Sequence, residues 1–105
     1  MIKVSENVID KIVKRIVEIS QPEKIILFGS AARGEIGPNS DVDILVVKSN
    51  VHRRRMAQKI YMHLFDIEHA VDVVVVTPED IEKYKDSFAL VIEPVLQEGK
   101  VVYAR

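Results

Sequence analysis

The sequence contains no cysteine and no tryptophan, and only four glycines and four prolines. The absence of cysteine excludes disulfide bridges and thiolate metal sites and is compatible with a reducing cytosol. There is no apolar run of the roughly 18 residues that a membrane-spanning helix needs, and the stretch after Met1 is amphipathic rather than a signal segment. We therefore expect a soluble, cytoplasmic protein without a membrane partner.

The sequence also lacks an excess of either charge, because 15 lysines and arginines stand against 16 aspartates and glutamates, for a net charge of -1. Such a chain has no overall basic field of the kind that attracts nucleic acid, so direct nucleic-acid binding is not expected. The run Arg53-Arg54-Arg55 is interpreted as a solvated helix face. With 105 residues and no repeat, linker or low-complexity tract, the chain is expected to form one domain over residues 1–105.

One stretch of the chain combines a glycine turn with two acids. An apolar run ends at Gly29-Ser30, and ten residues after that pair Asp41-Val42-Asp43 leads into a second apolar run. Alternate residues of a strand share a face, so the carboxylates of Asp41 and Asp43 are predicted to project together, with Cα atoms about 6.5 Å apart. Because Mg²⁺ takes oxygen ligands and leaves room for substrate phosphates, this pair has the chemistry of half a metal site.

Gly29 and Ser30 have the chemistry of a phosphate-binding turn. Glycine allows a sharp turn and close approach of a ligand, and a following serine offers a hydroxyl and an N–H group to phosphate oxygens. A short helix starting at Ala31 would add its N-terminal N–H groups. Either feature alone is common in purely structural turns and strand caps. Their combination predicts that a phosphate and a metal ion meet at one place.

The residues from Gly29 to Asp43 resemble the signature of the DNA polymerase β-like nucleotidyltransferases. The matching positions are Gly29-Ser30, Ala32-Arg33-Gly34, Ser40 and Asp41-Val42-Asp43. More narrowly, they resemble the minimal nucleotidyltransferases (MNT), which are antitoxin partners of helical HEPN toxins. The resemblance implies that Gly29, Ser30, Arg33 and Ser40 bind the nucleotide, with Arg33 contacting phosphate or bracing the motif. From the residues alone, Arg33 is equally well a solvated cation at a helix end.

A third carboxylate comes from a β-branched run, residues 71–76, which is predicted to be a strand buried on both faces. Asp72 lies near the start of this strand, where it is either an edge or cap residue or a buried group. A buried Asp72 would need a partner, because a buried unpaired carboxylate is costly. The resemblance implies that an acid from this strand joins the Asp-x-Asp pair, and only Asp72 fits. The implied catalytic and metal-binding residues are therefore Asp41, Asp43 and Asp72.

The remaining pattern concerns the fold. Helices are predicted over residues 6–19, 51–65 and 78–85, and strands over 25–28, 41–47, 71–76 and 101–103. Pro94 is expected to break or kink the helical stretch 88–97, or to begin a separate turn. Periodicity leaves the relative direction of the first two strands open. The resemblance implies a nucleotidyltransferase-like mixed sheet with core strands in the order 1-2-3, flanked by helices, in the α+β class.

The resemblance further implies a Mg²⁺-dependent enzyme that moves a nucleoside monophosphate, AMP from ATP, to a hydroxyl of a partner protein. Two Mg²⁺ ions would be held by the three acids, one lowering the pKa of the acceptor hydroxyl and one stabilising the departing pyrophosphate. Almost nothing follows the third strand that could form an acceptor domain, so the acceptor surface is expected to come from a HEPN toxin. The alternative is a non-catalytic antitoxin that neutralises its partner by steric occlusion.

Several residues have weaker signals. Tyr84, Phe88 and Tyr103 are candidates for a partner interface, and packing on the chain's own sheet explains them equally well. The three histidines lack the spacing of a zinc motif and are not expected to bind metal. The nucleotide base, the acceptor residue and the oligomeric state cannot be read from the sequence.

Overall fold

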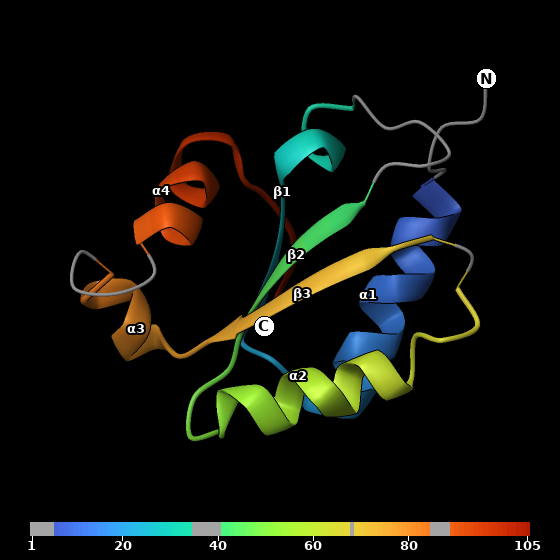
Figure 1. The fold of residues 1–105 in the computed structure, drawn as a ribbon, viewed down its shortest axis with the longest axis horizontal. Coiled ribbons are helices and arrows are strands. Elements are labelled where there is room, and N and C mark those ends of the chain that lie inside the picture. Colours follow the sequence, from blue (N-terminus) through green and yellow to red (C-terminus); the bar gives the residue numbers. More distant parts are fainter. Residues whose placement is uncertain (1–5, 35–40, 68, 85–88) are drawn as a thin grey trace.

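The computed structural model describes residues 6–34, 41–67, 69–84 and 89–105 (Figure 1). In chain order its elements are α1 (Glu6–Ser20), β1 (Lys24–Phe28), the 3-10 turn η1 (Gly29–Ala31), β2 (Val42–Val47), α2 (Arg53–Met62), β3 (Val71–Val76), α3 (Pro78–Glu82), α4 (Ala89–Glu98) and β4 (Lys100–Ala104). In the part of the chain so described, no helix has both the length and the apolar character to cross a bilayer.

The four strands form one mixed sheet in the order β3-β2-β1-β4. Strand β1 is antiparallel to both β2 and β4, while β2 and β3 are parallel and α2 lies between them in the chain. The predicted α+β class and the core strand order 1-2-3 are therefore confirmed. The antiparallel pairing of β1 with β2 decides the strand direction that periodicity left open. The predicted last strand is present as β4 at the edge beside β1.

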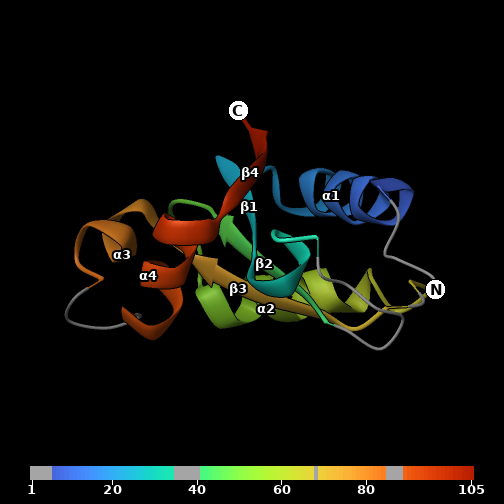
Figure 2. The same ribbon diagram turned by 90° about the horizontal axis from the view of Figure 1, so that it is seen from above.

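Helices cover the sheet on both faces (Figure 2). On one face α1 and α2 pack over a cluster in which Ile12 and Ile16 are fully buried, as the helical spacing of α1 predicts. On the other face α4 contributes Ile92 and Val95 to a second cluster. Consecutive residues of β2 from Ile44 to Val47 alternate between the two clusters, as a period of two requires. Strand β2 is therefore packed between the two apolar clusters.

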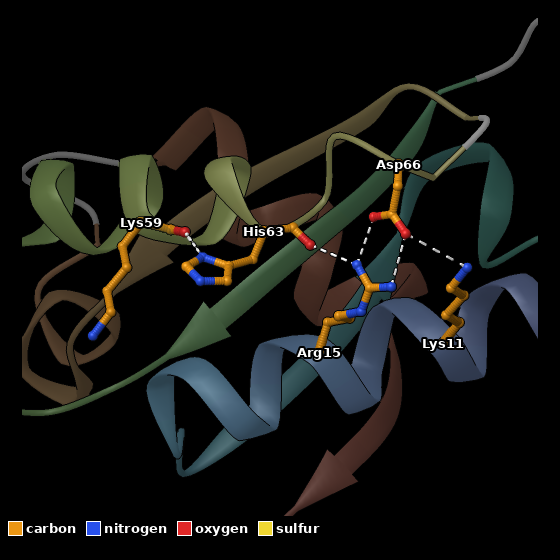
Figure 3. Close-up of polar contacts among 5 residues, drawn as sticks. All are labelled: Lys11, Arg15, Lys59, His63 and Asp66. Carbon is orange, nitrogen blue, oxygen red and sulfur yellow. Dashed lines mark hydrogen bonds and ion pairs between the residues drawn. The ribbon is translucent and has the colours of Figure 1, made fainter.

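The helix α2 is shorter than predicted at both ends. It begins at Arg53 with His52 as its N-cap, and it ends at Met62 instead of continuing to residue 65. Beyond the helix, Arg15 of α1 donates to both carboxylate oxygens of Asp66, at 2.6 and 2.9 Å (Figure 3). This ion pair holds the segment that follows α2 against α1.

The start of α3 is as predicted, but its end is not. The Thr77 hydroxyl accepts a hydrogen bond from the backbone N–H of Asp80, whose carboxylate in turn accepts one from the N–H of Thr77. This reciprocal pair is a capping box, which fixes the first turn. The helix ends at Glu82 rather than near residue 85, because Lys83 already has φ -111° and ψ 24°, outside the helical region.

The predicted break or separate turn at Pro94 is wrong, because α4 is one α-helix with Pro94 inside it, while a kink stays a prediction. A proline removes one helical hydrogen bond, here to the carbonyl of Leu90 in the first turn. Burial of the neighbouring residues Ile92 and Val95, which are 1% and 5% exposed, offsets that loss. The ring of Pro94 itself is exposed and so does not disturb the packing.

Candidate active site

The two parallel strands β2 and β3 place Asp43 and Asp72 opposite each other. These residues are register partners in the β2/β3 ladder, and Asp41 lies just before β2, which begins at Val42 and not at residue 41 as predicted. Asp41 and Asp72 both affect the pKa of Asp43, and Asp41 and Asp43 both affect the pKa of Asp72. The three side chains are therefore close neighbours. The structure therefore brings together the carboxylates that the sequence proposed for one site.

Burial and mutual repulsion disfavour the charged forms of two of these acids. Burial is the main cause that raises the pKa of Asp43, and the negative charges of Asp72 and Asp41 raise it further. The pKa of Asp72 is raised by the same desolvation and by the charge of Asp41. The hydrogen bond to Asp72 also raises the pKa of Asp43, so the group resists carrying a full negative charge on every member.

The turn after β1 brings Gly29 directly against Asp43. Gly29 has φ +68°, a left-handed conformation, and a Cβ atom at this position would overlap Asp43 Oδ2. The turn η1 begins at Gly29, two residues earlier than the helix start predicted at Ala31, and the N–H of Ala32 donates to the Gly29 carbonyl at 3.1 Å. Glycine is thus required here by the neighbouring carboxylate, a reason that the sequence alone did not reveal.

Arg33 links this turn to the C-terminal helix. Its guanidinium binds the carboxylate of Glu98, the last residue of α4, at 2.7 Å. Such a partner is what a bracing role for Arg33 requires, but the side chain is 42% exposed, so the bracing role and the solvated cation both stay predictions. Contact with a phosphate stays a prediction. Glu98 was missed because it lies 65 residues away in the sequence with no motif to mark it.

The remaining proposed residues have mixed outcomes. Ser30 lies in η1, half-buried beside Gly29. Ser40 and the interface candidate Phe88 lie outside the described residues. The other two interface candidates, Tyr84 and Tyr103, pack against the chain's own apolar clusters. The arginines at the start of α2 are exposed, as predicted.

The histidines are not grouped with the three acids. The Nδ1 atom of His52 accepts a hydrogen bond from the N–H of Arg55, and His63 contacts the carbonyl of Lys59 at 2.8 Å. Within the described residues, no three or more His, Cys, Asp and Glu side chains are grouped tightly enough to hold a metal ion. The three acids are thus neighbours without forming a closed ligand shell.

The chemistry of these donors fits a hard divalent cation. Three carboxylates supply only oxygen ligands, as Mg²⁺ prefers, and their mutual repulsion is the kind that a cation relieves. A cavity of about 630 Å³, lined in part by Val51, Arg53 and Arg54, lies at the other end of β3, beside Val75. It is remote from the acids and has no part in this site.

The chain belongs to the nucleotidyltransferase domain family, whose model matches residues 9–102. This membership confirms the family that the motif resembles, and the mixed sheet with its strand order is the fold that the resemblance implied. No curated protein sequence matches the chain.

Solved structures extend the comparison. A toxin-antitoxin crystal structure with AMP-PNP is 28% identical, with a TM-score of 0.59, and the match covers 96% of this chain and 74% of that one. The MntA-HepT toxin-antitoxin structure is 24% identical, with a TM-score of 0.60 over 96% and 74%. The complex of tri-AMPylated Shewanella oneidensis HEPN toxin with MNT antitoxin is 23% identical, with a TM-score of 0.52 over 95% and 70%. The predicted likeness to MNT antitoxins is confirmed at the level of the fold.

Proposed function

We propose that this chain transfers AMP from ATP to a side-chain hydroxyl of a HEPN-type partner protein and acts in that way as an antitoxin. The observation that carries the proposal is the pairing of Asp43 with Asp72 in adjacent parallel strands, with Asp41 beside them and the Gly29 turn against Asp43. The similar structures support the choice of reaction, since one contains AMP-PNP and another an AMPylated HEPN toxin. The protein would work as one domain in the cytoplasm, where ATP is supplied.

The reaction needs an acceptor, a triphosphate and a group that takes a proton. The acceptor oxygen attacks the α-phosphorus of ATP while the bond from that phosphorus to the bridging oxygen of the β-phosphate breaks, and pyrophosphate leaves with the bonding electrons. Asp72 is exposed at the sheet edge and has a raised pKa, so it is placed to receive the hydroxyl proton. Gly29 and Ser30 would bind the triphosphate beside Asp43.

The acids would also hold the cation that such a reaction uses. Mg²⁺ bound by Asp41, Asp43 and Asp72 would offset the charge of the triphosphate and lower the pKa of the acceptor hydroxyl. Arg33 would keep the Gly29 turn in place through Glu98. Except for Glu98, the residues with these roles lie at the starts of β2 and β3 or in the turn after β1.

The alternative function is that of an antitoxin that only occludes its partner. In that case the acids would be inherited from the fold without catalysing transfer. The two functions make different predictions for the mass of the partner.

The experiment incubates the purified chain with ATP, Mg²⁺ and a purified HEPN-type toxin, and measures the intact mass of that toxin. We expect a discrete increase of one or more AMP groups. The variant Asp43→Asn should abolish the increase and keep the fold, because removing a charge from a repulsive group does not destabilise it. The control Asp10→Asn changes an exposed acid of α1 and should transfer normally. A partner that binds without gaining mass would establish occlusion instead.

A further inference from the structure

Exposed apolar side chains gather at the C-terminal end of α2. In the described parts of the chain, the large hydrophobic residues that are exposed are Tyr61 (42%), Met62 (72%), Phe65 (86%) and Val101 (52%). Three of these four lie within five residues of one another, whereas Val101 is alone on β4. Single exposed apolar residues are normal, but a contiguous group indicates an interaction surface. We call Tyr61, Met62 and Phe65 the α2 apolar surface.

A small cavity lies within this surface and contains an unsatisfied polar atom. Its volume is about 220 Å³, and its lining residues are Tyr61, Leu64, Phe65, Ile67, His69 and Val71. The Nδ1 atom of His69 is buried, and among the described residues it has no hydrogen-bond partner. The nitrogen is thus part of the cavity wall and not a group that a docked molecule can reach. The cavity itself offers a protein partner a place for one apolar side chain.

The α2 apolar surface is held in position and does not fold back onto the core. Arg15 of α1 binds the Asp66 carboxylate through two hydrogen bonds and also the carbonyl of His63 at 2.8 Å (Figure 3). The hydroxyl of Tyr61 accepts a hydrogen bond from the N–H of Val73 in β3 at 2.7 Å. A surface fixed in this way loses little conformational entropy when a partner binds.

The surface adjoins the candidate active site on the side where an acceptor must arrive. The order β3-β2-β1 puts the Gly29 turn on one side of Asp43 and Asp72 on the other, at the free edge of the sheet. Val71 lines the cavity and is the residue before Asp72, and side chains of adjacent strand residues point to opposite faces. The α2 apolar surface and Asp72 therefore lie on opposite faces at the free edge of the sheet, and a molecule that wraps around the edge of β3 would meet both.

We propose that the acceptor protein docks on the α2 apolar surface, across the edge of β3, and presents its hydroxyl to Asp72 from that side. This inference rests on the proposed function. The exposed groups are apolar and aromatic, which suits a protein anchor and gives a phosphate backbone nothing to pair with. The anchor is an apolar side chain of the partner that enters the cavity beside Tyr61 and Phe65.

The test compares Phe65→Ser and Met62→Gln with the control Val101→Ser, using a purified HEPN-type toxin as the probe in calorimetric titration. Truncating a central anchor weakens binding by about tenfold or more, so both α2 variants should lose at least that much affinity. The control should bind like the wild type, because Val101 lies at the opposite edge of the sheet. Affinity for a nonhydrolysable ATP analogue should be unchanged in all three variants.

The outcomes separate this inference from the function on which it rests. Unchanged affinity of Phe65→Ser for the partner overturns the docking surface, and AMP incorporation by the wild type is then judged on its own. Loss of binding in Phe65→Ser with no AMP incorporation by the wild type keeps the docking surface and replaces transfer by occlusion. A change in the self-association of the chain alone, measured by sedimentation, would assign the surface to a second copy and overturn the proposal. Because Phe65 is 86% exposed, its replacement should leave the melting temperature unaltered.

Discussion

Arg15 and Asp66 form a bidentate ion pair between α1 and the segment after α2, with N–O distances of 2.6 and 2.9 Å. The hydrogen bond from Arg15 is the main cause that lowers the pKa of Asp66 to about 2, and the charges of Arg15 and Lys11 add to it. The pair joins residues 51 positions apart, so it reports on tertiary structure and not on a local turn.

The Arg15–Asp66 pair predicts how stability depends on pH. The pKa of Asp66 is about 2 in the folded chain, below the value of about 3.9 in an unfolded one. The pair therefore stabilises the fold above about pH 4, and this contribution is lost as the pH falls toward 2. Thermal unfolding should show Asp66→Asn less stable than the wild type near neutrality, with the difference vanishing in acid. An identical pH dependence in both proteins would contradict it.

Two glycines offer a matched test of the turn after β1. Gly29 and Gly34 both have positive φ, +68° and +73°, but only at Gly29 would a Cβ atom meet Asp43. Each Gly→Ala change should cost about 1–2 kcal/mol for the left-handed backbone. Gly29→Ala should cost more, and it should also lower affinity for an ATP analogue because it displaces the Asp43 carboxylate. Chemical denaturation and calorimetry give the comparison, and equal losses in the two variants would refute the contact.

The ion pair between Arg33 and Glu98 permits a test of bracing against phosphate binding. If Arg33 acts by holding the Gly29 turn, Arg33→Gln and Glu98→Gln should weaken ATP-analogue binding by similar, modest factors, and the double variant should be no worse than either. An exposed pair contributes at most about 1 kcal/mol, which limits the loss in affinity to about fivefold. A large loss confined to Arg33→Gln would show direct contact with phosphate instead.

Pro94 tests the continuity of α4. Replacing it with alanine restores a helical N–H group for the carbonyl of Leu90, while the exposed ring contributes little packing. The expected net gain is about 1–2 kcal/mol, because proline also restricts the unfolded chain by about 0.4–1 kcal/mol. Thermal unfolding should therefore give a higher melting temperature for Pro94→Ala, with Gln97→Ala as an exposed control in the same helix. A lower melting temperature would mean that the proline ring packs in the native state.

Much of the fold is encoded in short-range patterns, which can be read without a structure. The alternation of Asp41 and Asp43 places them on one face in any strand, and residues 71–76 form β3 as their β-branched run predicts. The start of α3 needs only Thr77 and Asp80, three residues apart. In each case the interacting residues are near neighbours in the sequence, so the geometry of a single helix or strand determines the local structure.

Only the tertiary structure decided which distant residues meet. The register that sets Asp72 opposite Asp43 depends on the parallel pairing of β3 with β2, which no property of either strand specifies. Periodicity likewise could not predict the partner of Arg33, nor the packing that lets α4 contain Pro94. Such contacts close long loops and cost chain entropy, which the burial of both apolar clusters offsets. Because that burial is a property of the whole chain, local sequence carries no record of the pairs that it brings together.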